Sequence, residues 1–597
     1  MDKTSVFDII FNNDDQNESG DGISGKGFFS RELSGSMTKK FKRLLSKPVF
    51  KMGRSIAYFL SHISARVYGS MFFTFGLFSI ILFLLGFSHD SGILTPIIGG
   101  ALCLVSIPFL LFDKTLPMLL QDFVLTDYIF FEFFCMNRHN AIEGQKRCPV
   151  FLAILVGLIP AGLSTVLPLW QIALVICVAI MVYLGMESPE FIFLLSLFLL
   201  PYLKYINYGE TCLWFATLIT ILSFIRKVAY GKRVINIEQY DIFLALMMIF
   251  VLISGIFIKG LESFSGSLEM IVLAGGYLLA GNIITNRRLA ERVANTIVVS
   301  GAFAAIVSIV QLVVLLFKKA GSFEVADLSV VLARKDGMAV FFIAAVVFAV
   351  GMINQSKRLE RINYIFFASV SLVALIITGE FFAVAALLVG IATYFIIKSN
   401  KFLWVLPMLV FVPLLILVLP NSFLNILFYY SPSIASAEEL FGLWRNSLIV
   451  FINNFFVGIG IGSDSFAREM ADLGIFGYSD SSNLLIEISL EAGVFALLCF
   501  LAMVVTRIRH RSIQRIYVRN SQIETMVGVS GVCLFCLICF GMINYIWSDD
   551  AAYFLFWCIF GMGSASLRVA KKDYNDKVLY YEEYSDLDSS VIDIEIG

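Results

Sequence analysis

The feature that most constrains this chain is a long series of apolar segments, most of them close to the length that crosses a bilayer. The chain has 597 residues, of which 59% are hydrophobic and only 15% charged. We count about sixteen segments of roughly membrane-spanning length. This pattern predicts an all-α, polytopic transmembrane protein rather than a soluble enzyme. The segments lie near residues 70–87, 92–112, 150–167, 169–185, 190–203, 209–225, 241–258, 268–284, 295–317, 337–353, 363–377, 381–397, 402–422, 483–505, 526–543 and 551–567.

The distribution of Lys and Arg predicts the orientation of these segments. If the N-terminus is cytoplasmic and every segment crosses once, only eight of the 44 Lys and Arg residues fall outside. Cytoplasmic loops carry the excess of these residues in membrane proteins, so the bias predicts N-in and C-in. It also places residues 423–482, between the 13th and 14th spans, on the exoplasmic side. The eight outer residues are Lys204, Lys259, Lys318, Lys319, Arg334, Lys335, Arg445 and Arg468.

Three polar parts of the chain are distinct from the spans. Residues 1–66 form a tail that becomes basic, read either as a cytoplasmic arm on anionic lipid or as linker. Residues 569–597 form a solvated acidic cytoplasmic tail. Residues 115–135 are amphipathic and too rich in Asp and Glu to cross comfortably. We see no cleavable signal peptide, because no short apolar run near the start ends in a small-residue cleavage site.

The polar segment before the 14th span is where we look for chemistry. Ser436 and Glu439 have the spacing of a capping box, which predicts a helix running to about Phe455. Glycines in Gly458-Ile-Gly460-Ile-Gly462 supply flexible backbone and N–H groups, and Ser463-Asp464-Ser465 predicts the start of a second helix ending near Gly474. Asp480-Ser481-Ser482-Asn483 then leads into the next span. The first helix has an apolar stripe suited to a membrane surface or to other helices, made of Leu440, Trp444, Leu448, Phe451 and Phe455, with Arg445 off it.

Several of these motifs together resemble the O-antigen ligase and polymerase family of membrane glycosyltransferases. The similar run is Leu443-Trp444-Arg445, Gly458-Ile-Gly460-Ile-Gly462, Ser482-Asn483-Leu-Leu-Ile-Glu-Ile and Glu491-Ala-Gly493. Gly301 to Leu312 with Gln311, Thr378-Gly379 and Trp547-Ser-Asp549 also look like this family. The resemblance covers residues 187–568 and implies a twelve-span core, to which residues 67–186 add an N-terminal four-span module.

The resemblance implies an activity at the outer face of the bacterial cytoplasmic membrane. Family members move an oligosaccharide from undecaprenyl diphosphate to an acceptor hydroxyl, by ligation or polymerisation, with neither a metal nor another cofactor. Basic residues grip the diphosphate and a His activates the acceptor. Cations stabilise the charge that develops on the leaving diphosphate, and a base takes the hydroxyl proton. The expected partners are thus lipid-linked glycan, its acceptor and membrane lipids, and we expect no nucleic acid.

The chain departs from the family pattern at the expected base. Its four histidines are His62, His89, His139 and His510, and the family's His falls on Ser482. A serine is a poor base unless a neighbour takes its proton. We therefore predict Asp480 as the base, with Ser482 beside it. The alternative is that Asp480 caps the helix that begins near Asn483.

The remaining candidate site residues are cations, buried acids and one aromatic residue. Arg445, Arg468 and the pair Arg334-Lys335 are the cations for a diphosphate, or else anchors for lipid headgroups. Glu487 and Glu491 lie one turn apart in an apolar segment, where a charge needs a cavity or a partner. They line a substrate groove with Asp480 above them, or pack helices as protonated carboxyls. Trp444 and Asn483 are further candidate substrate-binding residues.

Two further readings of the chain remain open. A non-catalytic ligase-like relative that binds or scaffolds lipid-linked glycan would need no catalytic His, which explains its absence. A secondary transporter also has many spans and buried acids, although the sequence shows neither an internal repeat nor paired broken helices. Cys533, Cys536 and Cys539 share one helix face, which we interpret as core packing rather than a metal site.

Overall fold

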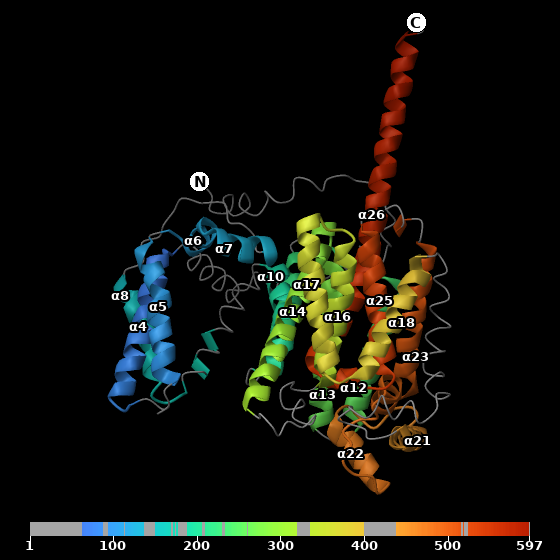
Figure 1. The fold of residues 1–597 in the computed structure, drawn as a ribbon, viewed down its shortest axis with the longest axis horizontal. Helices are drawn as coiled ribbons and strands as arrows, with labels where there is room; N and C mark the ends of the chain where they lie inside the picture. Colours follow the sequence, from blue (N-terminus) through green and yellow to red (C-terminus); the bar gives the residue numbers. More distant parts are fainter. Residues whose placement is uncertain are drawn as a thin grey trace. The chain divides into compact units, whose positions relative to one another are not determined.

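Long helices make up most of the computed structural model (Figure 1). Helices are expected, because in lipid every backbone N–H and C=O must be paired within the segment. No β-strand occurs in the described ranges, where one isolated bridge joins Ser64 and Thr115. The structure describes residues 63–87, 94–112, 114–135, 150–168, 171–172, 175–176, 188–205, 209–229, 233–258, 261–318, 335–398, 437–514, 517–518 and 523–595.

Nine helices within the described ranges are long and apolar enough to cross a membrane. The prediction of a multi-pass helical membrane protein is confirmed at this level, while the sixteen crossings and their orientation stay predictions. The 402–422 span and nearly all of the 169–185 span lie outside the described residues. The nine are Ala65–Leu84, Gly209–Val228, Tyr240–Phe257, Ser263–Ile283, Arg287–Val314, Glu360–Ile377, Leu484–Ile513, Glu524–Gly541 and Asp550–Asn575.

The chain divides into two compact units, and the first comprises Met1–Ile192 and Leu222–Ile235. Here α4 (Ala65–Leu84) packs against α5 (Leu94–Leu111) and α8 (Val150–Leu163). The acidic 115–135 stretch forms short pieces rather than a span: α6 (Leu116–Asp122), α7 (Val124–Thr126) and the π-helix η1 (Asp127–Phe133). The buried Glu190 carboxylate makes ion pairs of 3.0 Å with both Lys227 and Arg233. Two cations thus compensate one buried charge.

The second unit comprises Phe193–Ile221 and Asn236–Gly597. Its most extensive helix pairs are α13 (Leu261–Ile283) with α26 (Asp550–Glu595) and α12 (Gln239–Phe257) with α23 (Leu484–Ile513). A buried aromatic cluster around Trp547 and Trp557 fills the space near the start of α26. The other helices are α10 (Pro189–Leu199), η2 (Leu200–Tyr205), α11 (Gly209–Ala229), α14 (Arg287–Lys318), α16 (Lys335–Ile353), α17 (Arg358–Ile377), α18 (Phe381–Lys398) and α25 (Glu524–Gly541), of which α10 and α11 extend into the first unit.

Two short helices lie at one end of the second unit, which we call the α21 end. They are α21 (Ala437–Asn453) and α22 (Ser463–Asp472), whereas α26 extends from the opposite end (Figure 1). The position of the second helix was predicted correctly, and Gly474, with φ +77°, follows its last turn. The expected cap from Ser463-Asp464-Ser465 is wrong, because the N-cap residue is Gly462 and no side chain caps the helix. Ser436, the first member of the predicted capping box, lies outside the described residues.

The predicted apolar stripe of α21 is only partly the side that packs against other helices, and its alternative placement on a membrane surface stays a prediction. The side chains buried on α21 are Leu440, Leu443, Ser447 and Val450, whereas Leu448 is 44% exposed and Phe455 40% exposed. Tertiary packing decides which side of α21 is buried, because Leu443 and Val450 form one cluster with residues outside α21. These are Phe466 and Met470 of α22, Ile459 and Leu490. Hydrophobicity alone did not distinguish this face from its equally apolar neighbour.

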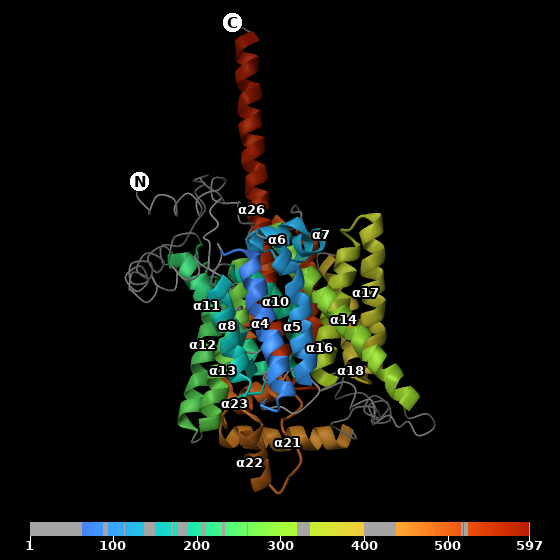
Figure 2. The ribbon, with the colours of Figure 1, turned by 90° about the vertical axis from the view of Figure 1, so that its left-hand side faces the viewer.

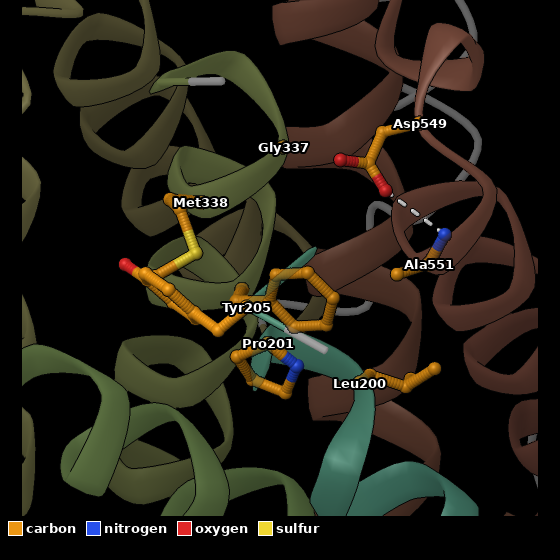
Figure 3. A pocket seen from close by; sticks show the side chains of 8 residues that line it. Leu200, Pro201, Tyr205, Gly337, Met338, Asp549 and Ala551 are labelled. Atoms are coloured by element: carbon orange, nitrogen blue, oxygen red, sulfur yellow. Dashed lines mark hydrogen bonds between the residues drawn. The ribbon is translucent and has the colours of Figure 1, made fainter. Parts of the chain in front are cut away.

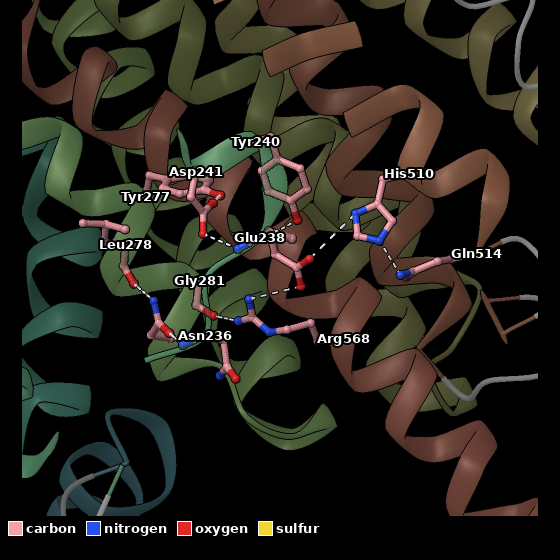
Figure 4. A network of polar contacts seen from close by, with 12 residues as sticks. Asn236, Glu238, Tyr240, Asp241, Tyr277, Leu278, Gly281, His510, Gln514 and Arg568 are labelled. Atoms are coloured by element: carbon pink, nitrogen blue, oxygen red, sulfur yellow. Dashed lines mark hydrogen bonds and ion pairs between the residues drawn. The ribbon is translucent and has the colours of Figure 1, made fainter. Parts of the chain in front are cut away.

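A polar network holds four helices together at the opposite end of the second unit (Figure 4). Glu238 caps α12 in a capping box with Asp241, and its carboxylate lies 3.9 Å from both His510 of α23 and Arg568 of α26. Tyr277 of α13 donates a hydrogen bond to Asp241. Burial raises the pKa of Glu238 above its ordinary value, an effect that Arg568 and Lys571 partly offset.

Candidate functional site

The site is built on a break in helix α23 near the α21 end. Gly493 has φ +79° and ψ 176°, so the helical hydrogen bonding stops for about one turn and starts again. The loop after α21 pairs with the backbone groups left open by the break. Ile459 N–H donates to the Leu490 carbonyl at 2.7 Å, and Val494 N–H donates to the Phe455 carbonyl at 3.0 Å. The broken backbone is therefore paired with protein, as apolar surroundings require.

Glycine is required where this loop crosses α23. A Cβ atom on Gly458 would overlap the carbonyl oxygens of Leu490 and Glu491, and one on Gly493 would overlap the Phe456 carbonyl. Both glycines also have positive φ, which side-chain-bearing residues rarely adopt. Two motifs that the sequence keeps about thirty residues apart, the Gly-x-Gly-x-Gly run and Glu-x-Gly, thus contact each other directly.

Helices α12 and α13 fix the glycine loop from the other side. Ser254 of α12 donates a hydrogen bond to the Glu491 carbonyl, and Ser263 of α13 accepts one from the Ile461 N–H at 3.0 Å. A Cβ atom on Gly460 would lie 2.6 Å from the Ser263 hydroxyl. These contacts hold the loop N–H groups against the buried carboxylates described next.

Glu487 and Glu491 lie in the last two turns before the break, and both are buried. Glu487 accepts a hydrogen bond from the Ser481 N–H at 2.7 Å. Glu491 accepts one from the Tyr545 hydroxyl at 2.8 Å and a longer one from the Gly462 N–H at 3.4 Å. Each carboxyl is therefore held by N–H or O–H donors, as burial of such a group demands.

Asp480 and Ser482 form a tight turn that leads into α23, next to Glu487. The Asp480 carboxylate accepts a hydrogen bond from the Ser482 N–H at 2.9 Å and lies 3.4 Å from the Ser482 hydroxyl. Ser482 is in the left-handed conformation with φ +52°. Asp480 also interacts electrostatically with Glu487, so the turn and the buried acids share one site.

The alternative role for Asp480 as a helix cap is wrong. The side-chain oxygen of Asn483 caps α23 by accepting from the N–H groups of Leu485 and Ile486 at 3.0 and 3.2 Å. The Asn483 amide group also donates to the Met542 carbonyl at 2.7 Å, which ties α23 to the end of α25. Asn483 is thus a structural residue of the site, and the Asp480 carboxylate, which is not needed for the cap, remains half-buried at the surface of the turn.

Residues 542–549, between α25 and α26, complete the site, and sequence reasoning missed most of them. Burial raises the pKa of Tyr545 well above its ordinary value, and the neighbouring Glu491 carboxylate raises it further. The tyrosine therefore stays protonated and donates to Glu491. Asn544 makes a 3.4 Å hydrogen bond to the buried Glu380. Nothing in the local sequence distinguishes these two side chains from ordinary loop residues.

The predicted cations do not meet the acids. Arg445 on α21 and Arg468 on α22 are both exposed, and neither makes a hydrogen bond or ion pair with Asp480, Glu487 or Glu491. Arg334 and the side chain of Lys335 lie outside the described residues. Trp444 packs edge-on against Phe441 at 5.7 Å between ring centroids, and its indole N–H has no partner among the described residues.

A small pocket opens near the start of α26 (Figure 3). The Asp549 carboxylate lies at one edge and accepts from the Ala551 N–H at 2.9 Å, which caps α26. Tyr205, whose hydroxyl hydrogen-bonds to Gln311, forms part of the opposite wall. Asp549 thus lines this pocket, and Gln311 contacts it through the Tyr205 hydroxyl. Its lining comprises Leu200, Pro201, Tyr205, Gly337, Met338, Phe341, Asp549 and Ala551.

The described residues do not form a metal centre, since no group of three metal-ligating side chains occurs among them. Cys533, Cys536 and Cys539 are buried in α25, where Cys536 packs against Gly390 of α18. His510, the one histidine in the described ranges, belongs to the network at the opposite end.

The arrangement is suited to hydrogen-bonding and proton transfer rather than to binding an anion in the acidic turn. Carboxylates accept hydrogen bonds from hydroxyl groups, and Asp480 is the acid at the surface where such a group can reach it. Glu487 and Glu491 are enclosed behind it. No protein-family model matches the chain, and no curated protein matches it significantly.

Proposed function

We propose that this protein transfers an oligosaccharide from an undecaprenyl-diphosphate carrier to an acceptor hydroxyl at the exoplasmic face of the membrane. The observation that carries the proposal is the gathering of three motifs on the first part of α23, two of them at its break and one at its start. The Gly458–Gly462 loop crosses α23 beside Glu491-Ala-Gly493, where the Ile459 N–H donates to the Leu490 carbonyl and the Gly462 N–H reaches the Glu491 carboxylate. The Ser482-Asn483 turn begins the same helix, and the neighbouring Ser481 N–H donates to Glu487. These are the motifs on which the resemblance to O-antigen ligases and polymerases rests.

In this proposal Asp480 receives the acceptor hydroxyl and acts as the base. A sugar hydroxyl donates to Asp480, which takes its proton as the oxygen attacks the anomeric carbon and the bond to diphosphate breaks. A positioned base contributes about 10² to 10⁴ in rate. Glu487 and Glu491 hold the Ser481–Ser482 turn and the glycine loop in place through their hydrogen bonds. The diphosphate lies at Arg445 and Arg468, because a cation lowers the cost of its developing charge.

The decisive experiment replaces Asp480 by Asn in the full-length protein. Asn keeps the size of the side chain and accepts from the Ser482 N–H, but it does not take a proton. We expect transfer from a lipid-linked donor to fall by about 100-fold or more, with unchanged membrane insertion. Asp472→Asn is the matched control, because Asp472 is an exposed acid at the end of α22. It should leave transfer unchanged.

The same assay separates an enzyme from a non-catalytic relative. Equal transfer by Asp480→Asn and the parent would show that Asp480 is not the base. A parent that binds lipid-linked glycan but transfers none would instead make this chain a binder or scaffold. Ser482→His restores the family's residue beside Asp480, so in an active enzyme it should raise transfer.

A secondary transporter is the second candidate, and the broken helix favours it. Discontinuous spans with buried carboxylates form ion and substrate sites in transporters. The α23 break, with Glu487 and Glu491 in the two turns before it, has both features. Uptake driven by a sodium or proton gradient into liposomes tests this candidate. Driven uptake that is lost in Glu491→Gln, together with absent glycan transfer, would replace our proposal.

A further inference from the structure

One face of α21 exposes a continuous apolar surface, which we call the outer face of α21. Its residues are spaced three and four apart and therefore share one side of the helix. Ile452 is 68% exposed and Phe456, just past the helix end, is 64% exposed. This side is opposite the buried Leu443, Ser447 and Val450. The outer face comprises Arg445, Leu448, Ile449, Ile452, Phe455 and Phe456.

This face continues without interruption onto two spanning helices. Phe456 stacks on Phe495 of α23 with 6.1 Å between ring centroids, and Phe495 stacks on Phe250 of α12 at 5.3 Å. Phe495 is itself 42% exposed, and α12 exposes Ile249, Ile256 and Phe257 along its length. In a multi-pass protein the exposed apolar side chains of spanning helices face hydrocarbon. The outer face of α21 is thus an extension of a lipid-facing surface.

The orientation of α21 and the one cation of its outer face match the surface of a bilayer, while the exposed Glu438 lies two turns before Arg445 at the start of the helix. Figure 2 shows α21 running across the direction of the spanning helices, at the end where α23 begins. Arg445 lies among the apolar residues of the outer face, one to two turns before Ile449 and Ile452. A long arginine side chain keeps its stem on apolar surface while its guanidinium reaches phosphate.

We propose that the outer face of α21 is embedded in the adjacent leaflet of the bilayer, with the guanidinium of Arg445 at the level of the lipid phosphates. Helices of this kind bury their apolar face about 5–10 Å into the boundary between headgroups and acyl chains. The proposal does not depend on glycan transfer. It does place the Asp480 turn close to the membrane surface, because the loop after α21 is fixed to the break in α23.

The test measures the surroundings of the outer face in the full-length protein reconstituted in nanodiscs. A bimane fluorophore is attached to Ile452→Cys, or as matched control to Ala467→Cys on the exposed surface of α22. Labelled parent protein provides the background from natural cysteines. We expect lipids with a nitroxide on the acyl chain to quench bimane at position 452 strongly, and aqueous iodide to quench it weakly. Position 467 should show the reverse.

Two outcomes would overturn the proposal. Strong iodide quenching at position 452 would place the outer face in water. Protection from both quenchers would show that a protein surface, either a second copy or another partner, covers it. Arg445→Glu provides an independent readout: it should weaken lipid quenching at position 452 in anionic nanodiscs, with a change of roughly fivefold in the ratio of embedded to lifted α21. Arg445→Lys should retain the quenching. Equal lipid quenching in the parent, Arg445→Glu and Arg445→Lys proteins would show that Arg445 does not contact the lipid phosphates.

Discussion

At the scale of single residues, Ser482 occupies a conformation that most side chains avoid. Its φ of +52° lies in the left-handed region, and the Asp480 carboxylate secures the turn by accepting from its N–H. Asn, Asp and His adopt this region more readily than other non-glycine residues. On conformational grounds, a histidine would fit this position better than most side chains do.

This conformation leads to a prediction about stability. Ser482→Val should destabilise the protein by about 1–2 kcal/mol, because a β-branched residue is strained at positive φ. Ser482→Asn is the control, since Asn adopts the left-handed region readily, and it should unfold close to the parent. The measurement is thermal unfolding in detergent. Equal midpoints for the Val and Asn variants would mean that the turn relaxes away from positive φ.

The candidate site shows which residues the sequence was able to predict. Asp480, Ser482, Asn483, Glu487 and Glu491 are close in the chain, so their proximity followed from one short run and one helix. Their roles did not follow, since the helix cap depends on which side chain reaches the free N–H groups. The partners from other elements share no local pattern with the run and came only from tertiary packing, namely Ser254, Ser263 and Tyr545.

At the scale of elements, the break in α23 depends on a glycine. Gly493→Ala should destabilise the protein by about 2 kcal/mol or more, because the new methyl group meets the Phe456 carbonyl and the residue keeps a positive φ. Gly442→Ala is the matched control: a Cβ atom there has no neighbour within 4 Å, and Ala favours the helix by about 0.5–1 kcal/mol. Thermal unfolding of both variants tests the pair, and a tolerated Gly493→Ala would argue against the close crossing.

The capping network of α12 predicts a pH dependence. Because the folded-state pKa of Glu238 is raised, the folded protein holds this proton more tightly than the unfolded chain. Its stabilising contribution is complete below the ordinary value near 4.5 and is lost as the pH rises through the folded value. Glu238→Gln should therefore flatten the fall in unfolding temperature from that pH towards neutrality. An unchanged profile would assign the pH dependence to other groups.

The helices themselves followed well from the sequence, but their faces did not. Apolar length located α4, α5 and α12 to within a few residues of their bounds. The sequence did not indicate which of the two apolar sides of α21 packs against protein, because α22 and Leu490 select it. The break in α23 was also missed, since Gly493 within a long apolar run resembles any glycine in a spanning helix.

At the scale of the whole molecule, the orientation across the membrane is the main untested prediction. A cysteine at Ser463 should react with a membrane-impermeant maleimide in whole cells, and one at Ser512 should not. The reason is the charge bias, which places the α21 end outside. Ser463 is exposed at the start of α22, which makes it a better position than the fully buried Ser481. Labelling only at Ser512 would invert the orientation and remove the proposed activity from the outer face.

The crossing between the glycine loop and α23 also affects how the protein is made. Residues 454–462 leave the ribosome before residues 484–513. The Phe455 carbonyl and the Ile459 N–H, which pair with the broken backbone of α23, are therefore already synthesised when α23 is inserted. A helix with open carbonyls at Leu490 and Glu491 is costly in lipid unless these partners accompany it. We therefore expect the loop at residues 454–462 and helix α23 to take their places in the membrane protein together, in one step of assembly.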